Sequence, residues 1–377
     1  MSLGALARYF LRLGAIGFGG PIALAGAMRR DLVERRKWIS AQDYLDGLAL
    51  AQLMPGPLAA QLAIYIGWVR GRVLGATIVA IAFVLPSFLM VLALAALYLH
   101  FGGMPWVADA FYGIGPVVIA IITRGATQLA RMTLRRDVVL WLIFGVNAFV
   151  TAWTGREEMW SILIGGAVVL AFRSRAPRIV ETRSLPALAL MSWLVSGAQG
   201  PASGETLARI VTYFTQAGAL VFGSGLAIVP FLKSGVVDGF HWLDERQFMD
   251  AIAIGMITPG PVVITVAFIG QLVAGPLGAL LATLAVFVPC WLLVVLPAPH
   301  FARVARSERL RHFVQGVTAG AAGAIAGAVF VLGHRAIVDV LSLILALAGL
   351  FALQRWPKTP EPVWIFVGGI AGLLARR

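Results

Sequence analysis

Long apolar stretches with few charges recur along this chain and limit what it can fold into. A helix needs about 20 apolar residues to cross the hydrocarbon core of a bilayer. The full-length stretches are residues 74–99, 107–130, 138–154, 277–296 and 313–332, and the shorter ones are 159–172, 338–353 and 362–375. Only 12% of the residues are charged, about half the share found in soluble domains. We therefore predict an all-α polytopic membrane protein surrounded by the lipid bilayer.

The chain carries a net charge of +13. In a soluble protein this charge would suggest a nucleic acid partner, whereas membrane proteins concentrate Lys and Arg in their cytoplasmic loops. We therefore expect no nucleic acid partner. The single cysteine, Cys290, excludes an intrachain disulfide.

Two further apolar regions are interrupted. Residues 10–28 contain Gly17-Phe18-Gly19-Gly20-Pro21, and residues 45–69 contain Pro55-Gly56-Pro57. A proline can occupy the first turn of a helix but disrupts its interior. Broken helices at membrane depth persist only where protein buries them or where they line a wet cavity. We interpret both regions as paired half-helices that form re-entrant hairpins.

The two halves of the chain repeat each other, and the matches include residues that are rare in an apolar sequence. At a shift of 204 residues, Phe18-Gly19 aligns with Phe222-Gly223, Trp38 with Trp242, Asp46 with Asp250, and Pro55-Gly56-Pro57 with Pro259-Gly260-Pro261. One residue is then lost, and at a shift of 203 Pro86 aligns with Pro289 and Gly113 with Gly316. This pattern indicates an internal duplication.

Basic loops in one half align with loops of the other half that lack them. Residues 29–37 are rich in Arg and Lys, whereas residues 233–241 hold one Lys and one Asp. Residues 100–106 hold no Lys or Arg, whereas residues 303–311 hold four Arg. Since basic loops stay cytoplasmic, we predict two inverted-topology repeats, an arrangement typical of secondary transporters. The first repeat spans residues 1–172, a linker with a short helix spans 173–206, and the second, inverted repeat spans 207–377.

These motifs resemble one family of bacterial membrane proteins, the chromate transporter family. The resemblance rests on Phe18-Gly19-Gly20-Pro21, the basic stretch ending at Trp38, residues 52–57, Gln61 and residues 65–67. Residues 222–225, 258–261 and 268–270 resemble the second domain of its long form. The resemblance implies a transporter, not an enzyme, that exports chromate across the bacterial inner (plasma) membrane, with sulfate as a look-alike. The second half departs from the pattern of the first, since Ser224-Gly225 replaces Gly-Pro, and Thr258 and Thr265 replace Met54 and Gln61.

A helix that begins in mid-membrane offers an anion its first amide N–H groups, and its dipole is equivalent to about +0.5 elementary charge at that end. We therefore predict a substrate site built from the breaks and the polar side chains beside them. Its residues are Arg12, Phe18, Gly19, Gly20, Pro21, Gln52, Pro55, Gly56, Pro57, Gln61, Gly223, Ser224, Gly225, Thr258, Pro259, Gly260, Pro261 and Thr265. The alternative is that the Gly and Pro residues serve only helix packing and that the polar side chains satisfy freed backbone carbonyls.

Four charged residues lie in or beside the apolar regions. The planar guanidinium of Arg12 suits a tetrahedral oxyanion, and snorkelling to the interface is its alternative role. Arg124 lies within an apolar run, where a charge is costly. The aligned acids Asp46 and Asp250 could form salt bridges or carry a coupling proton.

Two rival functions remain open. An amino-acid exporter with similar hairpins would need an acid for the ammonium group, and only Asp46 and Asp250 lie near the breaks. An intramembrane enzyme acting on lipid phosphates would need a base or nucleophile in the membrane, but every Glu and His falls in a loop or at a helix end. We expect no metal and no cofactor, because the sequence has no metal-ligand cluster and no phosphate-binding loop. The chain could act alone or as a homodimer.

Overall fold

A computed structural model describes residues 2–18, 20–101, 104–135, 137–155, 159–173, 196–197, 200–220, 225–300, 308–357 and 359–376. The short helix predicted within the linker lies outside these residues, as do three predicted site residues, Gly19, Gly223 and Ser224.

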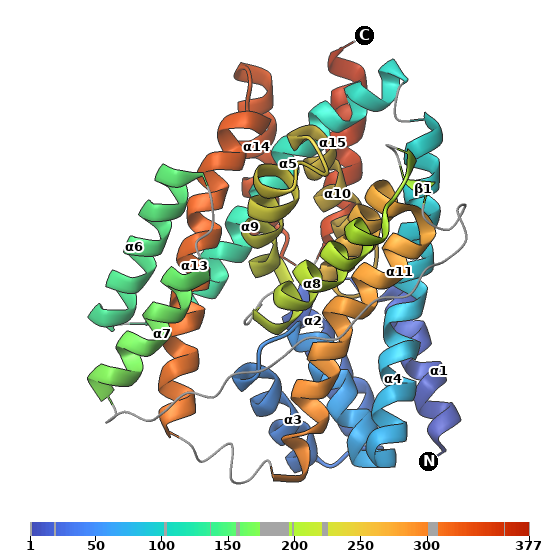
Figure 1. Ribbon diagram of the computed structural model, residues 1–377, viewed down its shortest axis with the longest axis vertical. Helices are drawn as coiled ribbons and strands as arrows, with labels where there is room; N and C mark the ends of the chain where they lie inside the picture. Colours follow the sequence, from blue (N-terminus) through green and yellow to red (C-terminus); the bar gives the residue numbers. More distant parts are fainter. Residues whose placement is uncertain are drawn as a thin grey trace.

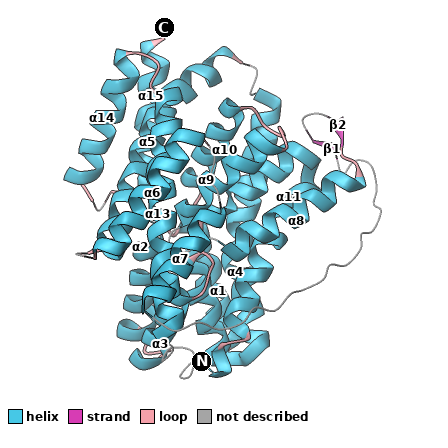
Figure 2. Ribbon diagram, turned by 60° about the vertical axis from the view of Figure 1, so that its left-hand side comes forward, coloured by secondary structure: helices cyan, strands magenta, loops and turns pink. Residues whose placement is uncertain are grey.

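The described chain is built from helices (Figure 1). The first half forms α1 (Leu3–Ile16), α2 (Gly20–Met28), the π-helix η1 (Arg29–Arg35), α3 (Ala41–Leu53), α4 (Leu58–Phe101), α5 (Pro105–Leu134), α6 (Val138–Thr154) and α7 (Met159–Arg173). The second half forms α8 (Gly204–Leu220), η3 (Gly225–Ala227), α9 (Ile228–Leu232), the π-helix η4 (Lys233–Gly239), α10 (Glu245–Ile257), η5 (Val262–Ile264), α11 (Thr265–Val295), η6 (Ala298–His300), α13 (Glu308–Ala336), α14 (Val340–Arg355) and α15 (Glu361–Ala375). Between the halves, β1 (Ser196–Gly197) and β2 (Gly200–Pro201) form a short antiparallel pair at the edge of the molecule (Figure 2).

Among the described residues, four helical segments are long and apolar enough to cross a bilayer, namely Leu58–Phe101, Pro105–Leu134, Val262–His300 and Glu308–Ala336. The shorter apolar stretches of the sequence form α6, α7, α14 and α15. Large apolar side chains face outward, including Trp153 with 81% of its surface exposed and Phe172 with 79%. Such a surface is stable against lipid rather than water. The prediction of an all-α polytopic membrane protein is therefore confirmed.

The duplication extends to irregular details of the backbone. The π-helices η1 and η4 begin 204 residues apart, and after each one a residue with positive φ follows, Lys37 in the first half and His241 in the second. The helices α4 and α11 each contain a kink, at Gly71-Arg72 and at Ala274-Gly275, which are 203 residues apart. The first kink falls at Arg70-Gly71-Arg72, the basic break between the apolar stretches that end at residue 69 and begin at residue 74, and the second falls in its counterpart, residues 273–275. Each kink separates the returning arm of a hairpin from a long apolar helix.

Each half packs its last two helices against the other half. The helices α6 and α7 pack on α13, whereas α14 and α15 pack on α5 (Figure 1). Matching glycines allow the closest approaches, because a methyl group at Gly113 would overlap the carbonyl oxygen of Gly368 and one at Gly316 would overlap that of Gly165. The repeats are thus intertwined rather than side by side.

Equivalent long helices run in opposite directions along the long axis of the molecule. In Figure 1 the chain ascends along α4 after its kink and descends along α5, whereas it descends along α11 after its kink and ascends along α13. The turns at Gly56-Pro57 and at Pro259-Gly260-Pro261 are buried inside the molecule.

Candidate functional site in the hairpin turns

The hairpin predicted over residues 45–69 is present in the structure. The helix α3 ends at Leu53, Pro55-Gly56-Pro57 forms the turn, and α4 begins at Leu58. The two arms lie against each other, because a methyl group at Gly47 would overlap the ring of Tyr65. Both of these residues are nine positions from Gly56, so the arms run antiparallel. The turn itself is buried at Gly56 and Pro57.

The second hairpin has the same construction. The helix α10 ends at Ile257, Pro259-Gly260-Pro261 forms the turn, and the chain returns through η5 into α11. A methyl group at Gly255 would overlap the hydroxyl of Thr265, and both residues are five positions from Gly260. The glycine at each turn has positive φ, +134° at Gly56 and +98° at Gly260, which favours glycine over other residues.

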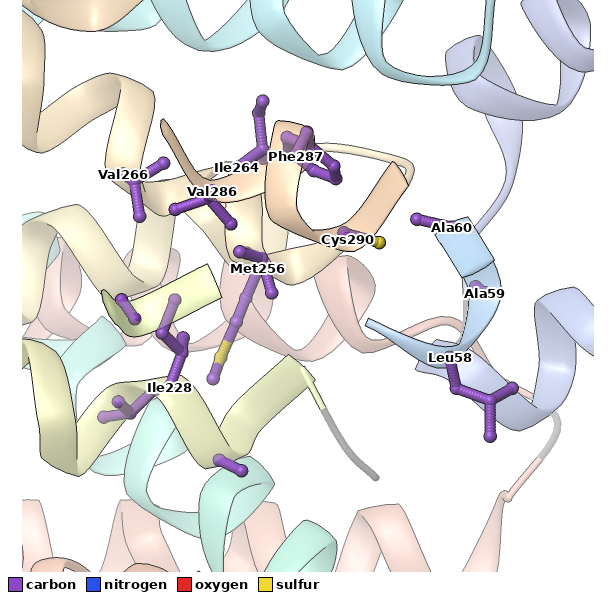
Figure 3. Packing of buried hydrophobic residues seen from close by; sticks show 14 of the residues in the cluster. Leu58, Ala59, Ala60, Ile228, Met256, Ile264, Val266, Val286, Phe287 and Cys290 are labelled. Carbon is purple, nitrogen blue, oxygen red and sulfur yellow. The ribbon is translucent and has the colours of Figure 1, made fainter. Parts of the chain in front are cut away.

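Each turn is held by a residue of the other repeat. Gly56 lies beside Cys290 of α11, whose Sγ would be 3.2 Å from a methyl group at Gly56. Ser87 of α4, the residue equivalent to Cys290, donates a 2.7 Å hydrogen bond to the carbonyl oxygen of Pro259. Ser87 is completely buried. The repeats are therefore linked at their turns, and Figure 3 shows Cys290 opposite Ala60 at the start of α4.

The second turn also contacts the break in the first half. The amide of Gly260 donates a 2.9 Å hydrogen bond to the carbonyl oxygen of Gly17, which directly follows the end of α1. Gly225, the last residue of the second glycine break, begins η3 and lies near Val262 and Val263. The fold thus brings the second turn together with parts of both glycine-rich breaks.

Backbone donors at the start of α4 are buried without acceptors. Leu58, Ala59 and Ala60 are 9%, 3% and 1% exposed, and their amides have no hydrogen-bond acceptor within the described residues. The first paired amide is that of Gln61, which donates to the carbonyl oxygen of Pro57 at 3.0 Å. Buried unpaired amides are rare in folded proteins. Together with the helix dipole, they give this turn a positive electrostatic potential.

The predicted side chains divide into two groups. Gln61, Thr258 and Thr265 are buried, and each donates a hydrogen bond to a backbone carbonyl next to its turn. This is the alternative role considered from the sequence. Gln61 also keeps its side-chain oxygen Oε1 buried without a partner in the described structure. Gln52, in contrast, is exposed on α3.

The residues of the first break lie nearer the surface. Phe18 is 38% exposed, Gly20 begins α2 with a φ of +72°, and Pro21 follows within the first turn of that helix. Arg12 is exposed on α1, close to the exposed Ile16. Within the described residues, Arg12 forms no ion pair.

The three remaining charged residues have separate surroundings. Asp46 accepts a 2.8 Å hydrogen bond from Gln42, whereas Asp250 is 3% exposed and accepts a 2.7 Å hydrogen bond from the hydroxyl of Tyr98. Arg124 is half-buried on α5, and its neighbour Gly125 packs against Leu226, just after the second glycine break. Among the described residues, none of Asp46, Asp250 and Arg124 forms an ion pair.

Sequence reasoning missed Ser87, Cys290 and Tyr98. The sequence did contain a signal for Ser87 and Cys290. Each is a small polar residue that follows one of the aligned prolines, Pro86 and Pro289, within an apolar run. Tyr98 had no such signal, since its partner Asp250 lies in the other repeat. The structure also contains a buried ion pair at 2.9 Å between Lys233 and Asp238 in η4.

Long apolar helices with two hairpins that turn inside the molecule define a polytopic membrane protein of the transporter class. The chain matches the Chromate transporter family over residues 4–170 and again over residues 208–373. It belongs to this family.

Named relatives match nearly the whole chain. It is 51% identical to the "Chromate transport protein" of Cupriavidus metallidurans, over 98% of this chain and 92% of the relative. It is 48% identical to the "Probable chromate transport protein" of Synechococcus elongatus, over 99% of this chain and 95% of the relative. A chromate transport protein of Pseudomonas aeruginosa is 33% identical over 99% of this chain and 92% of the relative. No solved structure matches.

Proposed function

We propose that this protein is a secondary active transporter that exports chromate across the bacterial plasma membrane. The names of the relatives and the match of the family to both halves support the substrate. The observation that carries the proposal is the group of buried, unpaired amides at Leu58, Ala59 and Ala60. A tetrahedral oxyanion bound there would accept the hydrogen bonds of these amides, for which the described residues supply no acceptor.

The turn also supports a particular protonation state of the substrate. The amides are donors, whereas the Oε1 atom of Gln61, the next residue of the helix, is a buried acceptor without a partner among the described residues. Hydrogen chromate offers oxygens to the donors and one O–H group to the acceptor. Sulfate has the same tetrahedral shape but carries no proton near neutral pH. In this proposal the partnerless acceptor favours the protonated anion, and sulfate acts as the competing look-alike.

Two inverted repeats would let the carrier expose this site alternately on the two sides of the membrane. The loop charges and the opposite directions of α4 and α11 in Figure 1 support inversion. The test is cysteine labelling in a Cys290→Ser background, with single cysteines in place of Arg30 and Ser307. We expect both to react only from the cytoplasmic side. Reaction from opposite sides would contradict inversion.

Transport itself is tested with purified protein in liposomes loaded with radiolabelled chromate. We expect release above that of empty liposomes, inhibition by excess sulfate, and a rate that rises as the pH on the chromate side falls. Collapsing the pH gradient and the membrane potential in separate experiments identifies the coupling. Flux no greater than that of empty liposomes under every gradient would refute the proposed function.

A further inference from the structure

A cavity of about 450 Å³ opens between α5, α6 and α13. None of its lining residues belongs to the hairpin turns. Its walls come from both repeats, since α5 and α6 belong to the first half and α13 to the second. The lining residues are Thr123, Ala126, Thr127, Ala130, Arg131, Arg135, Trp141, Phe144, Ala326 and Val329.

One end of the cavity is cationic. Arg131 and Arg135 are both exposed, and neither forms an ion pair within the described residues. The nearest acid in the sequence, Asp137, accepts hydrogen bonds from the amides of Val139 and Leu140 and caps α6. Trp141 donates through Nε1 to the carbonyl oxygen of Arg135, which ties the loop to α6. Two guanidinium groups are therefore available at this end.

The rest of the cavity is apolar and open to the lipid side. Ala126, Ala130 and Ala326 are small residues that leave space between the three helices. The hydroxyl groups of Thr123 and Thr127 donate to carbonyl oxygens of their own helix, so they offer no free donor. Neighbouring apolar residues are strongly exposed, with Leu142 at 64% and Phe330 at 69%.

We propose that this cavity binds an anionic phospholipid. Its phosphate would lie between Arg131 and Arg135, and an acyl chain would run along the alanines toward Val329. Basic pockets between membrane helices at a basic loop bind anionic headgroups in this way. A free oxyanion would use the arginines but would gain nothing from the apolar walls. Because the walls come from α5, α6 and α13, the bound lipid also bridges the two repeats.

The test is native mass spectrometry of the full chain, purified after reconstitution in bilayers of phosphatidylcholine with a minority of phosphatidylglycerol. We expect one phosphatidylglycerol to stay bound. A basic residue near a charged membrane surface contributes about 1 kcal/mol, or roughly fivefold in affinity. Arg131→Gln and Arg135→Gln should each weaken retention about fivefold, and the double variant about 25-fold. Arg70→Gln, which removes an exposed arginine outside the cavity, is the matched control and should retain the lipid.

A second variant separates a lipid from a free anion. Ala326→Leu fills the apolar wall and leaves both arginines, so it should lose the lipid while keeping the fold. Equal retention of phosphatidylcholine and phosphatidylglycerol would overturn the proposal. So would displacement of the bound lipid by millimolar sulfate, or normal lipid retention in Ala326→Leu. A lipid-free dimer that Ala326→Leu dissociates would instead assign the cavity to a second copy of the chain.

Discussion

Replacing the two turn glycines by alanine should have different consequences, because the neighbours of the turns differ. Gly260→Ala should mainly lower stability, and Gly56→Ala should mainly lower chromate affinity. A methyl group at Gly260 would overlap the hydroxyl of the buried Ser87, which holds the turn through its hydrogen bond to Pro259. A methyl group at Gly56 would lie 2.6 Å from the Nε2 atom of Gln61 and 3.2 Å from Cys290 Sγ. Ser87, the neighbour of Gly260, is a fixed link between the repeats, whereas Gln61, the neighbour of Gly56, meets the methyl group with the end of a longer side chain.

The expected free energies follow from these contacts. Both alanines adopt a backbone conformation with positive φ, which costs about 1–3 kcal/mol. Gly260→Ala also displaces Ser87 and leaves the carbonyl oxygen of Pro259 without its partner, a further cost of about 1–3 kcal/mol. We expect Gly260→Ala to be about 1–3 kcal/mol less stable than Gly56→Ala, because the longer side chain of Gln61 can shift and still donate to the carbonyl oxygen of Pro55. Gly56→Ala instead displaces Gln61 and crowds the free amides, so chromate affinity should fall about 10- to 150-fold, equivalent to about 1.5–3 kcal/mol.

The assay measures thermal unfolding and chromate binding on the same monodisperse preparations. Ser87→Ala removes the hydroxyl that the new methyl group meets, so the double variant Ser87→Ala/Gly260→Ala should be more stable than the sum of the single changes predicts. Contacting residues typically show coupling of about 0.5–3 kcal/mol. Additive effects of Ser87→Ala and Gly260→Ala, or wild-type chromate affinity in folded Gly56→Ala, would refute this account of the turns.

Three further changes test other parts of the structure. Tyr98→Phe removes the donor to the buried Asp250 and should lower stability by about 1.5–3 kcal/mol; an unchanged melting curve would show that water replaces the hydroxyl. Gly275→Ala should destabilise the protein by about 1–3 kcal/mol at the kink of α11, where φ is +66°, whereas Arg72→Gly at the equivalent kink should not; equal melting temperatures for the two variants would contradict this. Arg12→Gln should abolish chromate flux in protein that still inserts, and Arg12→Lys should restore only part, because Lys lacks the planar fork; normal flux in Arg12→Gln would make Arg12 an interfacial anchor.

The hairpins could be predicted because their cause is local. Proline and glycine in an apolar run interrupt a helix whatever lies around them, and the repeat supplied a second example. The kinks of α4 and α11 also have local causes. Arg70 and Arg72 interrupt the apolar run at the first kink, and Pro276 directly follows the second kink at Ala274-Gly275.

The contacts between repeats could not be predicted, because they join residues far apart in the chain. Ser87 and Pro259 are separated by 172 positions, and nothing in either segment names its partner. The alignment of the two halves did show that Ser87 and Cys290 are equivalent, because each directly follows an aligned proline. Once Ser87 is known to contact the second turn, the duplication predicts that its equivalent, Cys290, contacts the first turn.

The two turns have diverged in a way that suits different tasks. The second turn is fixed, since Ser87 donates to Pro259 and the amide of Gly260 donates to Gly17. The first turn has a thiol in the place of the hydroxyl, and a thiol is a weak donor. Its following amides remain free and buried. In the transport mechanism that we propose, a rigid second turn would be the support against which the first turn binds and releases its anion.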